Sequence, residues 1–447
     1  MSRHNKEIKF ASKYWLYIIR CSLVIASFNA CASDPSIEQK KYAYPSDMSW
    51  VTAIQGGRDG QILRVTNLQK EGPGSLRAAL DTKGARTIVF EVGGVIDLER
   101  SVLQVTEPNV TILGQTAPAP GITLIRGGIN IRAPQTIIQH LRVRTGVDGQ
   151  TKASGWEVDG INVSAAHHVL IDHCSISWAI DENMSASGPR FKGDTPDEWR
   201  KGTSHHVLFS NNIAAEGLAE ASHSKGEHSK GSLVHDNVTQ IVFYRNIWAH
   251  NVERNPLLKG GVQASVVNNL IYNPRAKAIH YNLMALEWGE HAYQLGKLNV
   301  VGNVMRGGLS TKKGLPLMSL GGDGDLAYFE KDNIAVDQFG AALPMLGRYG
   351  QTRAQLLLKE APIDWPEGLQ AMPARDVETE LLRYAGARPW DRDADDVRIL
   401  YFIAEGRGVI INDEREVSSY PKAKMTQSAF KEQEWNLTTG MPQAVLR

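Results

Sequence analysis

Residues 240–247 read Gln240-Ile-Val-Phe-Tyr-Arg-Asn-Ile, and close variants of this stretch recur along the chain. Each variant is a short apolar run rich in β-branched residues, followed by a polar step, then Asn or Cys and another apolar residue. Such runs, bounded by turn residues, predict buried β-strands. The chain is therefore expected to be all-β. Four other copies are His168-Val-Leu-Ile-Asp-His-Cys, His206-Val-Leu-Phe-Ser-Asn-Asn-Ile, Ser265-Val-Val-Asn-Asn-Leu and Asn299-Val-Val-Gly-Asn-Val.

The spacing of these runs predicts a parallel β-helix. If Cys174, Asn212, Asn246, Asn269 and Asn303 are equivalent, the steps between them are 38, 34, 23 and 34 residues. The shortest step fits one coil of a solenoid, and the longer steps fit coils that carry loops. A β-propeller is the alternative, but its blades repeat at about 40 residues or more and would give more even steps. The recurring Asn also predicts a ladder of amide side chains at one turn of the coils.

The predicted β-helix covers residues 44–340, as one repetitive domain with additions at both ends. Ser75 is a good N-cap residue, so a short helix starting there is expected to cap the open first coil. Residues 360–447 are richer in charged residues and are expected to form a tail packed on the outside of the coils. Within this tail we expect a helix at about 376–385 and a strand at 408–411.

Residues 1–32 have the order of a secretory signal peptide: basic residues, an apolar run, then small residues. Cleavage after Ala32 is one interpretation, and a bacterial lipoprotein with lipidated Cys31 is the other. A transmembrane anchor is not expected, because Arg20 splits the apolar region into runs that are too short. The expected location is therefore outside a bacterial cell, in the periplasm, or on the outer membrane through a lipid anchor.

The charge of the chain limits its partners. There are 49 Lys and Arg against 48 Asp and Glu, which gives a formal net charge of +1. Nucleic-acid binding is not expected, because no global positive field is available for it. A polyanion must bind through a local cluster of positive charge.

Six short motifs occur in order along the predicted coils and together resemble one family. The chain is similar to the pectate lyases of polysaccharide lyase family 1, over roughly residues 44–310. The resemblance implies a right-handed parallel β-helix, an acidic polysaccharide substrate such as polygalacturonate, cleavage by β-elimination, Ca²⁺ as cofactor and a monomer. The motifs are Gly72-Pro-Gly-Ser-Leu-Arg, Thr87-Ile-Val-Phe-Glu-Val-Gly-Gly-Val-Ile-Asp, Gly114-Gln-Thr-Ala-Pro, Ile171-Asp-His-Cys-Ser-Ile-Ser-Trp, His223-Ser-Lys-Gly-Glu-His-Ser-Lys-Gly and Arg254-Asn-Pro-Leu-Leu-Lys-Gly-Gly.

The last motif implies the catalytic base. By the resemblance, Arg254 removes the C5 proton of the sugar, and Lys259 binds a uronate carboxylate where the family has a second arginine. Lysine keeps the charge at that position but lacks the planar fork of arginine. A free guanidinium is protonated at all ordinary pH values, so an arginine base needs positive charge around it. The alternative is that Arg254 only pairs with Glu253 or Glu216.

The His223 motif implies further substrate contacts. Lys230 takes the place of a family lysine that binds substrate one coil before the base, and Lys225 is a weaker candidate for the same role. His223 and His228 are expected to bond nearby backbone or sugar hydroxyls. A zinc site is not favoured, because neither Cys nor a close third ligand accompanies the two histidines in the sequence.

Four acidic residues are the predicted calcium ligands, since Ca²⁺ takes several oxygen ligands. Glu157 and Asp159 alternate and would share one face of a strand, and they align with an Asp-x-Asp calcium pair of the family. Asp181 and Glu182 follow one coil later. Ser185 stands where some relatives have another Asp, which leaves the number of ligands open. The alternative for each carboxylate is a salt bridge in a loop.

Two other functions remain open at this point. A hydrolase on the same fold would use two or three convergent carboxylates, which Asp159, Asp181 and Glu182 can supply. It would leave Arg254, Lys230 and Lys259 unexplained. A β-helix that binds glycan without cleaving it is the third possibility, because fold alone does not specify function.

Overall fold

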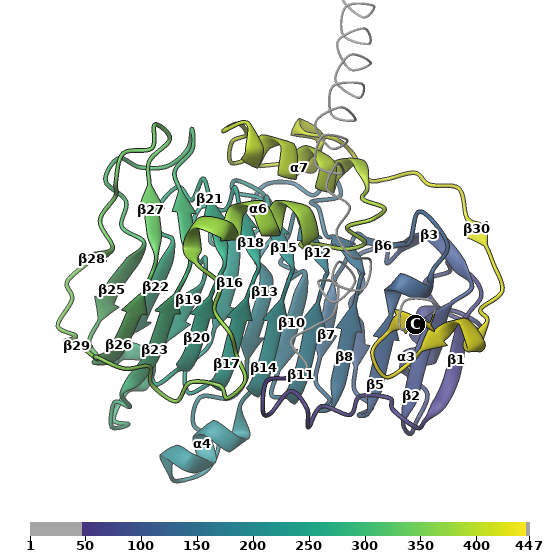
Figure 1. Ribbon diagram of the computed structural model, residues 1–447, viewed down its shortest axis with the longest axis horizontal. Coiled ribbons are helices and arrows are strands. Elements are labelled where there is room, and N and C mark those ends of the chain that lie inside the picture. Colours follow the sequence, from purple (N-terminus) through teal and green to yellow (C-terminus); the bar gives the residue numbers. More distant parts are fainter. Residues whose placement is uncertain (1–46, 444–447) are drawn as a thin grey trace, which may run out of the picture.

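The computed structural model describes residues 47–443, and the predicted signal peptide, with Cys31, lies outside this range. The described chain winds into a solenoid of three long parallel β-sheets (Figure 1). From β2 (Arg86–Phe90) onward, neighbouring parallel strands in a sheet differ by three in strand number. Each coil therefore contributes one strand to each sheet. This topology confirms the predicted fold class, a right-handed parallel β-helix. Within residues 47–443, every helix is too short or too polar to span a bilayer.

The first sheet has eleven strands, the second nine and the third ten. The first contains β1 (Gln61–Val65), β2 (Arg86–Phe90), β5 (Val110–Leu113), β8 (Thr136–Gln139), β11 (His167–Asp172), β14 (His205–Ser210), β17 (Thr239–Tyr244), β20 (Gln263–Val267), β23 (Gly296–Val301), β26 (Leu326–Lys331) and β29 (Leu356–Leu358). The second contains β4 (Leu103–Val105), β7 (Ile129–Ile131), β10 (Ile161–Ser164), β13 (Glu182–Ser187), β16 (Lys230–Val234), β19 (Leu257–Lys259), β22 (Ile279–Leu283), β25 (Met318–Gly322) and β28 (Leu346–Arg348). The third contains β3 (Val92–Asp97), β6 (Ile122–Ile125), β9 (Arg142–Arg144), β12 (Ser175–Ser177), β15 (Ile213–Ala215), β18 (Ile247–Ala249), β21 (Leu270–Tyr272), β24 (Val304–Arg306), β27 (Ile334–Val336) and the short antiparallel β30 (Thr426–Gln427).

The predicted amide ladder is present at the corner between the first and third sheets. The backbone N–H of each member donates to the side-chain Oδ1 of the asparagine in the next coil, over 2.8 to 3.0 Å. The side-chain Nδ2 groups donate to backbone carbonyls of the preceding coil, as from Asn246 to Phe209 O at 2.9 Å. These bonds satisfy buried polar groups that would otherwise carry a desolvation cost. The ladder runs through Cys174, Asn212, Asn246, Asn269, Asn303 and Asn333.

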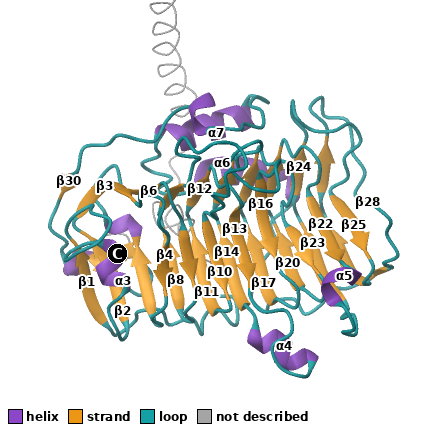
Figure 2. Ribbon diagram, turned by 180° about the vertical axis from the view of Figure 1, so that it is seen from behind, coloured by secondary structure: helices purple, strands orange, loops and turns teal. Residues whose placement is uncertain are grey.

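Helices cover one end and two sides of the solenoid. The predicted cap helix is α3 (Leu76–Leu80), and the Ser75 side chain accepts from Ala78 N at 3.2 Å as its N-cap. The helices α6 (Ala374–Tyr384) and α7 (Ala394–Ala404) lie along one side, and α4 (Pro196–Gly202) and α5 (Ala285–Trp288) lie on the opposite side (Figure 2). The short 3₁₀ helices are η1 (Gly114–Thr116), η2 (Glu414–Glu416) and η3 (Glu432–Glu434).

The tail packs on the third sheet. Val377 and Leu381 of α6, with Ile399 of α7, form a buried apolar cluster with residues of β15, β18 and β21. The predicted strand at 408–411 is wrong: Ile411 O accepts from Ala219 N of a loop at 2.9 Å, so this segment follows a loop instead of a sheet edge. The chain ends in a small hairpin, β31 (Trp435–Asn436) and β32 (Met441–Pro442). The division of the chain at residues 340 and 360 stays a prediction.

Candidate active site

Arg254 and the predicted acidic residues meet at the strand starts of the second sheet. Arg254 lies just before β19 and its Nη1 donates to Glu182 Oε1 at the start of β13, two strands away. Glu182 is directly opposite Lys230 of β16 in the register. The alternative partners of Arg254, Glu253 and Glu216, bind other cations instead. The solenoid thus brings together residues that are 72 positions apart in the chain.

The Arg254 side chain is mostly enclosed, with 21% of its surface exposed. Its Nε is buried and has no hydrogen-bond partner. Burial lowers the pKa of Arg254, and the nearby charges of Asp181 and Asp159 act against that shift. The net pKa lies below the ordinary value for arginine, which is the direction that a proton acceptor needs.

Asp159, Asp181 and Glu182 form a carboxylate cluster whose oxygen atoms lie within 4.8 Å of one another. Asp159 Oδ1 also accepts from the backbone N–H of Glu182 at 3.0 Å. Burial, followed by repulsion from Asp181, raises the pKa of Asp159 well above its ordinary value. Burial also acts to raise the pKa of Asp181, but the hydrogen bond from His228 and nearby positive charge outweigh it, so that pKa is lowered. Asp181 is therefore stabilised in its charged form, whereas the charged form of Asp159 is disfavoured.

Glu157 lies outside this triplet. The predicted strand at residues 157–159 is wrong, because β10 begins only at Ile161. Glu157 is exposed, and its Oε1 accepts from Ser224 N at 2.7 Å. That bond is the main reason that the pKa of Glu157 is lowered.

Each predicted substrate lysine of the second sheet is paired with a glutamate. Lys230 Nζ donates to Glu253 Oε1 at 2.8 Å, and Lys277 binds the other oxygen of Glu253. Lys259, at the end of β19, forms an ion pair with Glu287. By contrast, Lys225 is exposed in the loop that precedes β16. The sequence did not identify Glu253, Glu287 or Lys277 as ion-pair partners in this site, because the residues they pair with come from other coils.

His223 and His228 both face Asp181. His228 Nε2 lies 2.7 Å from Asp181 Oδ1, and His223 Nε2 lies 3.7 Å from the same oxygen. The two imidazole rings stack with centroids 3.6 Å apart. Burial lowers the pKa of His223. Sequence reasoning found no third ligand beside these histidines because Asp181 comes from the preceding coil.

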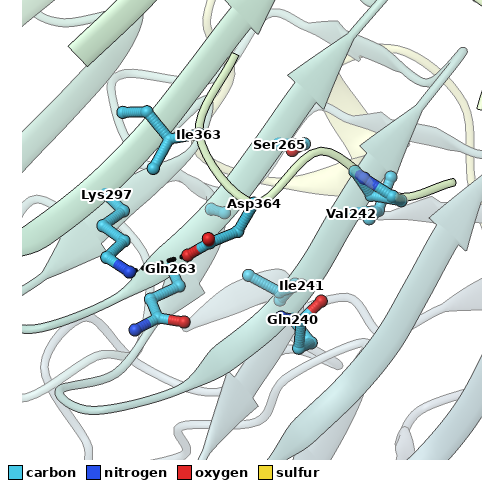
Figure 3. Close-up of a pocket in the computed structure, with 10 residues that line it drawn as sticks. Gln240, Ile241, Val242, Gln263, Ser265, Lys297, Ile363 and Asp364 are labelled. Atoms are coloured by element: carbon cyan, nitrogen blue, oxygen red, sulfur yellow. Dashed lines mark hydrogen bonds and ion pairs between the residues drawn. The ribbon is translucent and has the colours of Figure 1, made fainter. Parts of the chain in front are cut away.

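Two of the hollows on the outside of the solenoid differ in size. One, on the first sheet, lies beneath the segment 363–366 and offers only about 10 Å³, room for a single water molecule. There, Lys297 binds Asp364 at 2.7 Å and closes the segment onto the sheet (Figure 3). The other has about 290 Å³ and lies on the second sheet beside Asn282, the residue opposite Lys259 in the register. Of these two hollows, only the second is large enough for a sugar, and it lies beside the strand that carries Lys259.

Comparison with known proteins found sequence relatives that share one name. No family model matches the chain. A protein named "Probable pectate lyase C" from Aspergillus oryzae is 28% identical over 401 residues, which are 88% of this chain and 84% of that protein. A protein of the same name from Emericella nidulans is 34% identical over 232 residues, 52% of this chain and 48% of its own length. The chain is a relative of the pectate lyases. These relatives confirm the predicted resemblance and the predicted enzyme class, a polysaccharide lyase.

Solved structures support the fold of this pectate lyase relative. The cedar pollen allergen jun a 1 has a TM-score of 0.51 and 16% identity, covering 76% of this chain and 92% of the allergen. A Bacillus subtilis pectate lyase has a TM-score of 0.50 and 13% identity, covering 77% of this chain and 98% of its own. At these identities the likeness concerns the fold alone.

The relatives also correct the predicted localisation. The sequence led us to expect a bacterial protein, in the periplasm or on the outer membrane through Cys31. The matching pectate lyases come from Aspergillus and Emericella, which are fungi and have neither compartment. The prediction of a bacterial periplasmic protein or lipoprotein is therefore wrong.

Proposed function

We propose that this chain cleaves polygalacturonate, or a closely related uronate polymer, by calcium-dependent β-elimination with Arg254 as the base. The observation that carries the proposal is the contact of Arg254 with Glu182, a member of the carboxylate cluster, across the strand that begins at Lys230. The relative from Aspergillus oryzae, which matches most of the chain, is also named a probable pectate lyase. The arrangement supplies a proton acceptor and several carboxylate binders on neighbouring strands, about 4.8 Å apart.

The carboxylate cluster fits Ca²⁺ as a ligand set. Asp159, Asp181 and Glu182 offer only oxygen atoms, which hard cations such as Ca²⁺ prefer. Burial first, and repulsion from Asp181 second, raise the pKa of Asp159, and a bound cation would oppose both effects. We propose these three as the ion's ligands, with Glu157 as a fourth that reaches it from the loop. Bound Ca²⁺ would add the positive charge that stabilises a uronate carboxylate and the anion formed at C5.

The charge balance of the substrate groove, meaning the surface formed by Arg254, Lys230, Lys259 and the carboxylate cluster, supports a role for an added cation. Glu253 pairs with both Lys230 and Lys277, Glu287 pairs with Lys259, and Glu182 pairs with Arg254, so four cations face three glutamates. The charge of Asp181, whose pKa is lowered, offsets the remaining cation. An anionic polymer therefore meets little net positive charge, and a cation on the carboxylate cluster would add attraction.

Within this proposal, the lysines of the groove bind the substrate and Arg254 transfers the proton. Lys230 and Lys259 bind carboxylates of successive sugars, and their glutamate partners hold them in place beforehand. Exposed Lys225 contributes a weaker contact at the rim. Arg254 accepts the C5 proton, the C5–H electron pair forms the C4=C5 double bond, and the C4–O bond breaks. The leaving oxygen takes a proton from water, and the new non-reducing end is unsaturated.

Product chemistry tests the proposal directly. Polygalacturonate and other acidic polysaccharides are incubated with the enzyme, with and without Ca²⁺, and ultraviolet absorbance reports the unsaturated end. We expect absorbance with polygalacturonate and Ca²⁺, and its loss with a chelator or with Arg254→Ala. Arg64→Ala is the matched control, because Arg64 pairs with Glu91 in the cap, away from the second sheet. Cleavage to saturated products would indicate the hydrolase alternative, and binding without cleavage the non-catalytic one.

A further inference from the structure

A second metal-ligating cluster adjoins the carboxylate cluster and shares Asp181 with it. Its ligand atoms come from Asp181, His223 and His228 and lie within 4.8 Å of one another. Both histidines are almost fully buried, with 1% and 4% of their side-chain surfaces exposed. The proposed lyase mechanism uses neither of them.

The donor atoms of this cluster differ in kind from those of the calcium ligands. Two imidazole nitrogens and one carboxylate oxygen form a set that Zn²⁺ and related ions prefer, whereas Ca²⁺ takes oxygen ligands. The two rings lie 3.6 Å apart and within 15° of parallel, so both Nε2 atoms face the same small space beside Asp181 Oδ1. Three protein ligands with an open position are typical of accessible zinc centres.

His223 supplies an independent observation that points to a ligand. Its Nε2 is buried and makes no hydrogen bond, since the nearest carboxylate oxygen, Asp181 Oδ1, lies 3.7 Å away. A buried ring nitrogen left in this state costs free energy that a bound ion would recover. We propose that His223, His228 and Asp181 form a binding site for a transition-metal ion, with Zn²⁺ the expected species.

Glu157 then has a place in the same site. A histidine that binds metal through Nε2 carries its proton on Nδ1 and donates it to a carboxylate or carbonyl. His223 Nδ1 lies 3.4 Å from Glu157 Oε1, which is the carboxylate for that role. The Lys225 N–H donates to this Nδ1 at 3.1 Å, so the exposed loop at 224–227 must turn when the ion binds. Glu157 is thus a positioning residue for His223.

The shared Asp181 couples the two sites. A zinc ion on the histidines would draw the Asp181 carboxylate away from the calcium cluster, so Zn²⁺ would inhibit the lyase reaction. This inhibition rests on the proposed function, whereas zinc binding itself does not.

Calorimetric titration of the purified chain with Zn²⁺, after chelator treatment, tests the site without any activity measurement. We expect one equivalent of Zn²⁺ to bind, and His223→Ala and His228→Ala each to weaken binding at least about tenfold. Glu157→Gln is expected to weaken it by about tenfold, as for other carboxylates behind metal-bound histidines. Co²⁺ in place of Zn²⁺ gives visible absorption bands that report its nitrogen and oxygen ligands.

A second histidine cluster provides the matched control. His167, His168, His205 and His206 stack in pairs on the first sheet, so the double variant His205→Ala with His206→Ala removes two imidazoles elsewhere. We expect it to leave the zinc equivalent in place, and circular dichroism confirms that each variant is folded. Loss of zinc in this control, or unchanged binding in folded His228→Ala, would overturn the proposal. Absence of zinc binding by the native chain would also overturn it, and would leave the histidines as groups that only orient Asp181.

Discussion

Replacing Asn246 with alanine should cost much of the stability that holds the coils in register. Its Oδ1 accepts from both the backbone N–H and the Nδ2 of Asn212, each at 3.0 Å. Its Nδ2 donates to Phe209 O at 2.9 Å and to Asn269 Oδ1 at 3.0 Å. All four bonds are buried, so no water replaces the lost amide.

The magnitude follows from those bonds. Leaving the Asn212 N–H without an acceptor costs about 1–3 kcal/mol, and each of the other lost bonds costs about 1 kcal/mol. We therefore expect Asn246→Ala to lower the free energy of unfolding by about 4–6 kcal/mol. Asn333 ends the same ladder and accepts from Asn303 over 2.9 and 3.1 Å, but it is only partly buried. Water replaces its amide, so Asn333→Ala should cost only about 1 kcal/mol.

Urea unfolding followed by circular dichroism measures both variants against the native chain. The two substitutions are chemically identical and remove similar hydrogen bonds, so their difference isolates the effect of burial. If the two losses agreed within about 0.5 kcal/mol, the ladder would not be the stabilising element that its geometry indicates.

Three further predictions concern the groove. Lys259→Ala should raise the KM for polygalacturonate more than Lys225→Ala, because Lys259 is held on β19 whereas Lys225 is exposed in a loop, and initial rates over a range of substrate concentrations show the difference. Glu182→Gln should raise the calcium concentration needed for half-maximal activity at least about tenfold, and an unchanged calcium requirement would remove Glu182 from the ligand set. Burial raises the pKa of Glu253, but His280 and the two lysines outweigh it and bring that pKa to about 2. Glu253 therefore stabilises the fold above its unfolded pKa of about 4.3 and loses this contribution as the pH falls towards 2, so the destabilisation by Glu253→Gln in urea should be larger at pH 7 than at pH 2.5.

The repeating part of the fold was predictable because its contacts are local in the solenoid. Each coil touches only the coils beside it, so an asparagine at one corner has the same neighbours wherever it recurs. That is why the steps between Cys174, Asn212 and Asn246 were enough to predict the ladder. The segment at 408–411 was different: its apolar residues resemble a strand, yet they pack against a loop where no sheet edge is available.

The site was predictable only where its residues lie on strands. Glu182 and Lys230 begin neighbouring strands of the second sheet, and the register places them side by side, whereas Lys259 ends the next strand. Glu157 and the two histidines lie in loops, where no periodicity indicates which way a side chain points. The strand expected at Glu157 and Asp159 is absent, and Glu157 lies against His223 of another loop.

Asp181 shows how one loop changes the chemistry that the strands alone would support. On the side of Asp159 and Glu182 it belongs to an all-oxygen cluster suited to Ca²⁺. On the other side, His228 donates to it and lowers its pKa, so it stays ionised beside another carboxylate whose pKa is raised. The histidine loop therefore keeps negative charge at the place where the groove needs a metal ion. The same contact also makes the groove sensitive to any ion that prefers nitrogen, because Asp181 has only one carboxylate to offer both sites.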